Sequence, residues 1–223
     1  SAQAFTRRLQ AEVTRQTEVL EDTVAKLKKE AESRVASEKR KEFLSGHDIV
    51  TALATRRRLA AKIEAESVSL PPDRAFAVML IAIETTSGFL SRAGISRTDE
   101  LLAQAAKVIT QTVPDAFIAR FGDFSFACLV GPYPSGEIDE RILESGEVVC
   151  HALGQPIEVG GKLMNLRASA GIAVSRARGE TVADVIAKAD AALLHAQEQF
   201  DSRAYIFDEV LERRVVRRRD LES

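Results

Sequence analysis

The sequence predicts an α/β sandwich in which a mixed central sheet is flanked by helices and preceded by a long helix. Three observations support this class. Helical and strand-like patterns alternate after residue 46, two pairs of strands meet at glycine-containing turns, and the first 46 residues carry a helical pattern alone. The composition is that of a folded protein, because 45% of the residues are hydrophobic and 29% are charged.

The composition also excludes several partners. The formal net charge of −2 argues against a nucleic-acid-binding protein, because such domains are normally basic. The longest apolar run, residues 75–83, is far shorter than the ~20 residues of a membrane-spanning helix. Cys128 and Cys150 lie in apolar surroundings without a CxxC spacing, which is typical of reduced core thiols. We therefore expect a cytoplasmic segment without nucleic-acid or membrane contacts, and leave open a membrane anchor elsewhere in the parent protein.

Residues 1–46 are predicted to form a signalling helix. Apolar residues recur at spacings of four, seven, four, three and four, a near-heptad seam with one four-residue stutter; they are Leu9, Val13, Leu20, Val24, Leu27 and Ala31. A seam this narrow, with charges on the other faces, favours a parallel coiled coil and hence a homodimer. A single amphipathic helix packed on its own domain is the alternative. The pattern ends at Ser45-Gly46, which predicts a helix end and a hinge.

After the hinge, the expected elements alternate. Helices are predicted at 48–65, 99–111, 138–153 and 181–199, and strands at 76–84, 116–121, 125–130, 157–159, 162–173 and 204–207. Strand 76–84 is almost wholly apolar, which predicts a buried central strand. Gly122-Asp123 and Gly160-Gly161 predict tight turns, and Thr181 predicts a helix N-cap.

Five short motifs stand in register between residues 47 and 208. They are HDIVTALATRR at 47–57, RFGDFSF at 120–126, ASAGIA at 168–173, KADAAL at 188–193 and FD at 207–208. They resemble HDPLTGLPNRR, RYGGDEF, VSIGIA, RADxAL and FD of the GGDEF family, the diguanylate cyclase domains of bacterial signalling. The resemblance implies a nucleotidyl-cyclase-like sandwich.

Cyclases of this family join two GTP molecules into cyclic di-GMP, with Mg²⁺ held by carboxylates of the first strand and the signature hairpin. In this chain Ala82 stands at the first-strand metal position. Phe124 and Ser125 stand where the signature has its two acidic residues; the whole hairpin is Gly122, Asp123, Phe124, Ser125 and Phe126. Measured against the family pattern, these replacements imply no catalytic residue, no metal and no cofactor, and so no enzyme activity in this chain.

Three residues are weak nucleotide candidates. Glu84 is a possible surviving metal ligand. Asp99 aligns with the family's guanine-contacting aspartate, and can also be an acid favoured by the dipole at a helix N-terminus. Arg120 is either a scaffold residue of the hairpin or a phosphate ligand. The family's guanine-reading asparagine and phosphate-contacting lysine are replaced by Leu90 and Gln197.

The preferred hypothesis is a degenerate GGDEF domain at 47–208 that relays a signal from the helix at 1–46 to a following domain. Residues 209–223 resemble the linker helix that enters an EAL phosphodiesterase domain, so we expect an EAL-like neighbour, and a sensor domain before residue 1. A GTP-binding allosteric sensor, with GTP and Mg²⁺ bound but not turned over, is the alternative; an active cyclase is the third. The basic runs at 56–58 and 213–219 are interpreted as solvated helix faces.

Overall fold

The computed structural model describes residues 15, 24, 26–34, 46–84, 89–198 and 204–208; of residues 89–95 it describes the backbone only. The chain divides into two compact units, residues 1–45 and 46–223. In the first unit the described residues are helical, and Val24 and Leu27 of the predicted seam are exposed. Half of the seam, namely Leu9, Val13 and Leu20, lies outside the described residues, as does the predicted linker helix at 209–223. The coiled coil therefore stays a prediction.

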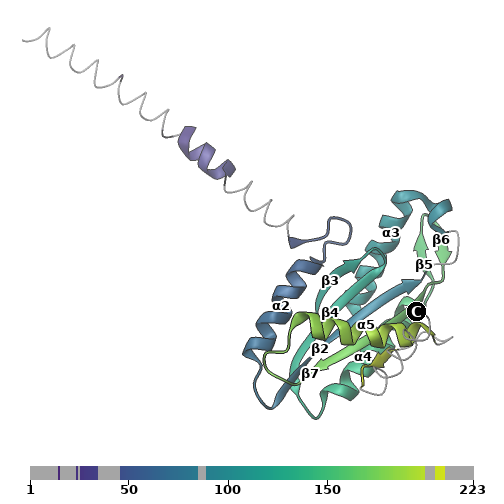
Figure 1. The fold of residues 1–223 in the computed structure, drawn as a ribbon. Helices are drawn as coiled ribbons and strands as arrows, with labels where there is room; N and C mark the ends of the chain where they lie inside the picture. Colours follow the sequence, from purple (N-terminus) through teal and green to yellow (C-terminus); the bar gives the residue numbers. More distant parts are fainter. Residues whose placement is uncertain are drawn as a thin grey trace, which may run out of the picture. The chain divides into compact units, whose positions relative to one another are not determined.

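The second unit is built on a six-stranded sheet with the strand order β1-β3-β4-β2-β7-β8 (Figure 1). The strands are β1 (Ala54–Thr55), β2 (Arg74–Glu84), β3 (Phe117–Gly122), β4 (Ser125–Pro134), β7 (Arg167–Ser175) and β8 (Ala204–Ile206). The edge pairs β1–β3 and β7–β8 are parallel, and the inner pairs are antiparallel. The sheet is therefore mixed, as predicted, with β2 at its centre.

Helices cover both faces of this sheet (Figure 1); they are α2 (Arg56–Ser69), α3 (Phe89–Thr112), α4 (Ile138–Leu153) and α5 (Val182–Glu198). Successive side chains of β2 point to opposite faces. Phe76, Val78 and Leu80 are buried with α2 and α5, whereas Met79 and Ile81 are buried with α3 and α4. Burial on both faces explains why β2 is apolar along nearly its whole length. The predicted fold class is confirmed.

Two contacts hold α2, α5 and β7 together. A Cβ atom added to Gly171 of β7 would lie 2.1 Å from the backbone nitrogen of Leu193 in α5, so only glycine fits there. At the end of α2, Ser67 Oγ donates to the Glu180 carbonyl at 2.7 Å, and the Ser67 carbonyl accepts the Gly179 N–H at 3.2 Å. The loop between β7 and α5 thus satisfies a carbonyl in the last turn of α2, which has no partner within the helix.

The first predicted helix is wrong at both ends. Residues 48–53 form a turn and Ala54–Thr55 a strand, and α2 then continues to Ser69. The turn forms because the Asp48 side chain accepts the Thr51 N–H at 2.9 Å, a local hydrogen bond that competes with helix formation.

Two further boundaries differ from the prediction. Helix α3 begins at Phe89, ten residues before the predicted start, since the burial of its later turns outweighs the propensity cost of Gly94. The predicted strand 162–173 is two strands. Its first part, β6 (Lys162–Met164), forms a separate two-stranded sheet with β5 (Ile157–Val159), whereas β7 begins at Arg167 and pairs with β2.

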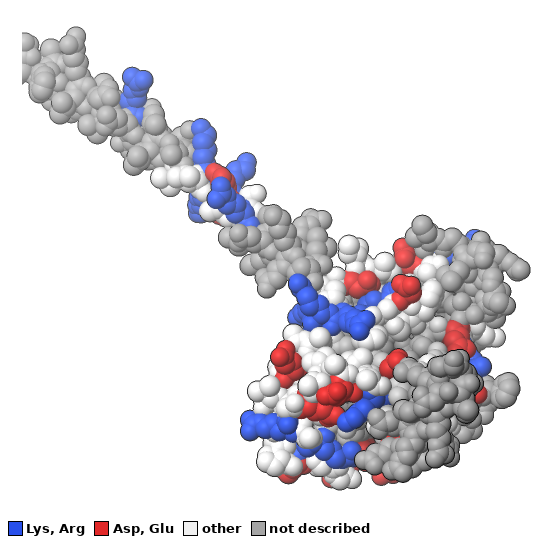
Figure 2. All heavy atoms as spheres, viewed as in Figure 1, with Lys and Arg blue, Asp and Glu red and all other residues white. Residues whose placement is uncertain are grey.

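Three further predictions hold, namely the helix at 138–153, the N-cap at Thr181 and the burial of the two cysteines. Helix α4 spans the predicted residues, and Thr181 Oγ1 accepts the Asp184 N–H at 3.1 Å as an N-cap does. Cys128 and Cys150 are both buried. On the face in Figure 2, acidic and basic side chains of the second unit are interspersed. Among the described residues, no helix has the length and apolar character needed to cross a membrane.

Candidate functional site

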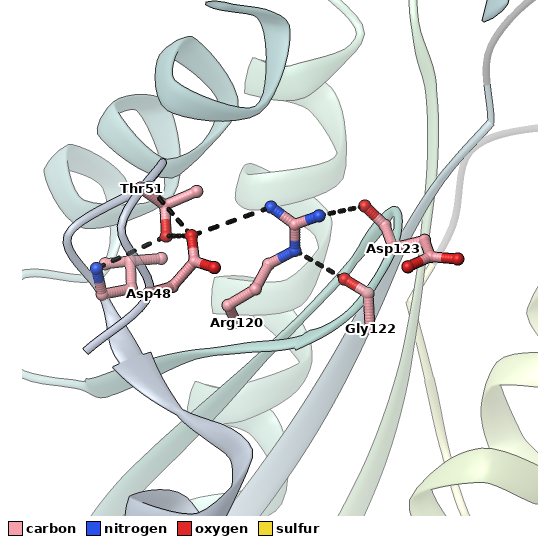
Figure 3. A network of polar contacts seen from close by, with 6 residues as sticks. Asp48, Thr51, Arg120, Gly122 and Asp123 are labelled. Atoms are coloured by element: carbon pink, nitrogen blue, oxygen red, sulfur yellow. Dashed lines mark hydrogen bonds and ion pairs between the residues drawn. The ribbon is translucent and has the colours of Figure 1, made fainter. Parts of the chain in front are cut away.

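The signature hairpin, at the β3–β4 turn, is held by Arg120 (Figure 3). Its guanidinium donates from Nε to the Gly122 carbonyl at 2.5 Å and from Nη2 to the Asp123 carbonyl. Only 15% of the side chain is exposed. Because a charged donor to backbone carbonyls fixes the turn that carries them, this geometry favours the scaffold interpretation of Arg120 over the phosphate ligand.

A second contact ties this hairpin to the residues that precede α2. Asp48 Oδ1 accepts hydrogen bonds from the Thr51 N–H and hydroxyl, and lies 4.0 Å from Arg120 Nη1 (Figure 3). Beside it, Thr55 of β1 pairs in parallel with Arg120 of β3. The opening motif and the signature motif therefore meet. Sequence reasoning quoted both motifs but missed the role of Asp48 in joining them.

The first-strand metal position and one of the two acidic positions of the signature face each other. Ala82 of β2 lies opposite Ser125 of β4, and on its other side opposite Ser169 of β7. The Phe124 side chain packs against the core, while its carbonyl accepts the Ile83 N–H at 2.9 Å. This row presents a methyl group between two hydroxyls and contains no carboxylate.

A divalent metal does not fit this row. Magnesium is bound in proteins mainly through carboxylates, and the three side chains of the row supply none. Within the described residues, no three histidine, cysteine, aspartate or glutamate side chains come together as a metal site would require. The Ser169 hydroxyl is buried without a hydrogen-bond partner among these residues.

Glu84 lies two residues beyond Ala82 on β2 and is engaged elsewhere. It pairs in register with Arg167 of β7, and Arg167 Nε lies 3.7 Å from Glu84 Oε2. The same guanidinium donates from Nη2 to the Gln197 carbonyl in α5 at 3.1 Å. Sequence reasoning missed Arg167, although a lone arginine at the start of an apolar strand was a visible signal.

Asp99 stands apart from this group. It lies well inside α3, on the opposite face of the sheet from Ala82, so the interpretation as a helix N-terminal acid is wrong. We call the row formed by Ser125, Ala82 and Ser169 the metal row, after the family's metal position at Ala82. The structure places Glu84 near the metal row and Arg120 at the signature hairpin, but it places Asp99 at neither. Its neighbour Glu100 accepts the Gly160 N–H at 3.0 Å and so anchors the β5–β6 hairpin on α3.

Comparison with known families decides which domain this is. The family model "Diguanylate cyclase, GGDEF domain" matches residues 45–203. The chain belongs to the GGDEF family. The resemblance found in the five motifs is thereby confirmed, and the domain is one of the cyclic di-GMP signalling family.

Curated relatives of this GGDEF domain are longer proteins. It is 28% identical over 161 residues to the bifunctional diguanylate cyclase/cyclic di-GMP phosphodiesterase MucR of Pseudomonas aeruginosa, covering 70% of this chain and 22% of MucR. It is 25% identical over 187 residues to the uncharacterized protein Mb1389c of Mycobacterium bovis, covering 83% of this chain and 29% of that protein. The chain thus spans less than a third of the length of either relative.

Solved structures share the fold. The coiled coil and GGDEF domain of DgcB from Caulobacter crescentus, in complex with cyclic di-GMP, superposes with a TM-score of 0.73 at 20% identity, over 84% of this chain and 98% of that one. The GGDEF domain of PA1120 from Pseudomonas aeruginosa gives 0.69 at 22% identity, over 76% of this chain and 99% of that one.

Proposed function

We propose that this GGDEF domain is a catalytically inactive regulatory and dimerisation module of bacterial cyclic di-GMP signalling. The observation that carries the proposal is the pairing of Ala82 with Ser125, which leaves the metal positions without a carboxylate. Phosphoryl transfer is catalysed almost wholly by positioning and charge neutralisation. Loss of one well-placed electrostatic group typically costs on the order of 10²–10³ in rate, and here two are replaced together.

The test is direct. The purified chain is incubated with GTP and either Mg²⁺ or Mn²⁺, and cyclic di-GMP is quantified by mass spectrometry beside an active diguanylate cyclase. We expect no product above the protein-free control, while a cooperative thermal transition shows that the chain is folded. Formation of cyclic di-GMP in proportion to protein concentration would refute the proposal and favour the active-cyclase hypothesis.

We further propose that the chain relays a signal from its N-terminal helix to a C-terminal EAL-type domain of the parent protein. Two observations support this. Asp48 connects the turn before α2 to the signature hairpin, and the relative MucR is named as both a cyclase and a phosphodiesterase. A displacement of Asp48 is then transmitted to the signature hairpin through Arg120, and this transmission requires no bound nucleotide.

The dimerisation part has its own experiment. Light scattering on the whole chain and on residues 46–223 compares their masses in solution. We expect a dimer for the whole chain and a monomer for the shortened one, because the apolar seam lies in residues 1–45. A whole chain that is monomeric at high micromolar concentration, or a shortened chain that stays dimeric, would exclude the proposed coiled-coil dimer.

A second candidate function is a GTP-binding sensor, and one observation favours it. Asp99 is partly buried within α3, where the helix dipole no longer explains an acid. Titration calorimetry with GTP in the presence of Mg²⁺ tests this candidate. Binding that Asp99→Ala abolishes and the neighbouring Glu100→Ala preserves would support it, and the absence of heat would remove it.

A further inference from the structure

The side chain of Arg167 occupies an unusual position at the end of the sheet that carries the signature hairpin. It lies in register with Glu84, its Nε is 3.7 Å from Glu84 Oε2, and its Nη2 donates to the Gln197 carbonyl at 3.1 Å. A single guanidinium therefore links β7, on which it stands, with β2 and α5.

Both groups that this guanidinium contacts, one in an ion pair and one in a hydrogen bond, are negative. Glu84 supplies a carboxylate, which forms an ion pair with Arg167. Gln197 is the penultimate residue of α5, where backbone carbonyls lack partners within the helix and carry the negative end of its dipole. Arginine suits this position because its guanidinium can form a hydrogen bond with one group and an ion pair with another, and because it keeps its charge at any physiological pH.

The guanidinium also lies close to the metal row. Ala82 and Glu84 are two residues apart on one strand, so they share a face of the sheet and stand about 7 Å apart. The residue opposite Ala82 on β7 is Ser169, and Arg167 is two positions from it on the same face. A fixed positive charge therefore adjoins the place where the family resemblance puts a divalent cation.

We propose that Arg167 is a built-in cation that replaces the divalent metal at this end of the sheet and keeps metal ions out. The inference rests on the proposed function, in which the chain needs no metal for catalysis. Arg167 neutralises Glu84, the one acidic side chain of β2, so that this carboxylate no longer attracts a metal ion. The chain thus lacks carboxylates at Ala82 and Ser125 and carries a guanidinium beside them, and the two features can be changed separately by mutation.

The experiment restores the ligands first and then removes the charge. Ala82→Asp/Ser125→Glu returns two carboxylates to facing positions, and Arg167→Gln is added to this double variant. Glutamine keeps an N–H donor for the Gln197 carbonyl but carries no charge. Mn²⁺ binding to the whole chain is measured from the electron paramagnetic resonance signal of the free ion. We expect the triple variant to bind Mn²⁺ at least about tenfold more tightly than the double variant.

Two matched variants show whether charge and location are responsible. Arg167→Lys in the double variant keeps the charge, so Mn²⁺ should bind as weakly as in the double variant. Arg176→Gln removes an arginine just after the other end of β7, where it pairs with Asp139, and should leave the affinity unchanged. Equal gains from Arg167→Gln and Arg167→Lys, or a similar gain from Arg176→Gln, would overturn the proposal.

Folding is checked by thermal unfolding of each variant. If Arg167→Gln unfolds the chain, Arg167→Met supplies a second uncharged side chain of similar length. A double variant that already binds Mn²⁺ as tightly as the uncharged triple variant contradicts the proposal. This outcome differs from failure of the proposed function, which is seen as cyclic di-GMP made by the unmutated chain.

Discussion

Strand β7 contains two regions that differ in what their residues contact. In its middle, Gly171 lies against the backbone of α5 with no space for a Cβ atom. At its beginning, Ser169 lies beside Ala82 with a buried hydroxyl that has no partner in the described part of the chain, and Arg167 pairs with Glu84. The two regions are only two residues apart along the strand.

This difference shows that the fold and the chemistry of the domain depend on separate positions. At Gly171, close packing fixes the residue type, and any larger residue must displace a helix. In the metal row, the backbone pairs the strands whether or not a side chain there can bind a metal. Carboxylates can therefore be lost from the row while the sandwich is kept. Mutations in the two regions should have opposite consequences for stability.

The largest effect is expected from Gly171→Ala. The new Cβ atom would lie 2.1 Å from the Leu193 nitrogen and 2.3 Å from the Ala189 carbonyl oxygen, and neither backbone atom can move without shifting α5. We expect a loss of more than about 3 kcal/mol in the free energy of unfolding, or failure to fold, in urea denaturation.

Gly136→Ala is the matched control for this substitution. A Cβ atom at Gly136 would meet nothing within 4 Å, and its backbone does not have positive φ. Its change should stay within about 0.5 kcal/mol. Similar stabilities for the two variants would show that the close approach of α5 to β7 does not determine the fold.

A smaller loss is expected from Ser67→Ala, where α2 meets the loop after β7. Ser67 is 2% exposed and its hydroxyl donates to the Glu180 carbonyl, which would lose this donor. We expect a loss of about 1–2 kcal/mol by chemical denaturation. Ser69→Ala, two residues later, removes an exposed hydroxyl bonded within its own helix and should change stability by less than about 0.5 kcal/mol. Equal losses from both would contradict a specific role for the buried contact.

Local signals account for the parts of the fold that the sequence predicted. The apolar run of β2, the turn between β3 and β4 and the helix Ile138–Leu153 each contain their own periodicity or turn residues. The turn at residues 48–53 was missed because it depends on the Asp48 side chain, and the start of α3 was missed because packing outweighs Gly94. The spacing of apolar residues along the sequence reveals neither the Asp48 hydrogen bond nor the packing of α3.

The site was predicted less completely, for a related reason. The resemblance to a known family singled out Ala82 and Ser125 separately, and the structure adds that they lie opposite each other on neighbouring strands. The pairing of Arg167 with Glu84 depends on the register between β2 and β7, two strands separated by more than 80 residues of sequence. Asp99 was assigned to a helix start because the first ten residues of α3 were not recognised.

Alkaline pH tests the buried core at Cys128 of β4 without altering the site. Burial raises the pKa of the Cys128 thiol from 9.0 to about 12. Below pH 9 the thiol is neutral in both states, and between pH 9 and about 12 only the unfolded state ionises, so stability falls. At pH 10 the loss due to Cys128 is about 1.4 kcal/mol. We expect Cys128→Ala to remove this share of the decline between pH 8 and pH 10; an unchanged decline would show that the thiol is hydrated in the folded state.

The smallest effect, with the opposite sign, is expected from Ser169→Ala in the metal row. Ser169 is 1% exposed, and its hydroxyl lost water on folding without gaining a hydrogen bond among the described residues. Since a buried polar group without a partner costs free energy, its removal should leave stability unchanged or raise it by up to about 1 kcal/mol. Ser67→Ala provides the comparison, because both serines are buried and only Ser67 is shown with a partner. A loss above 1 kcal/mol for Ser169→Ala would show that its hydroxyl is bound after all, so that the row around Ala82 is constrained by the fold as strictly as Gly171.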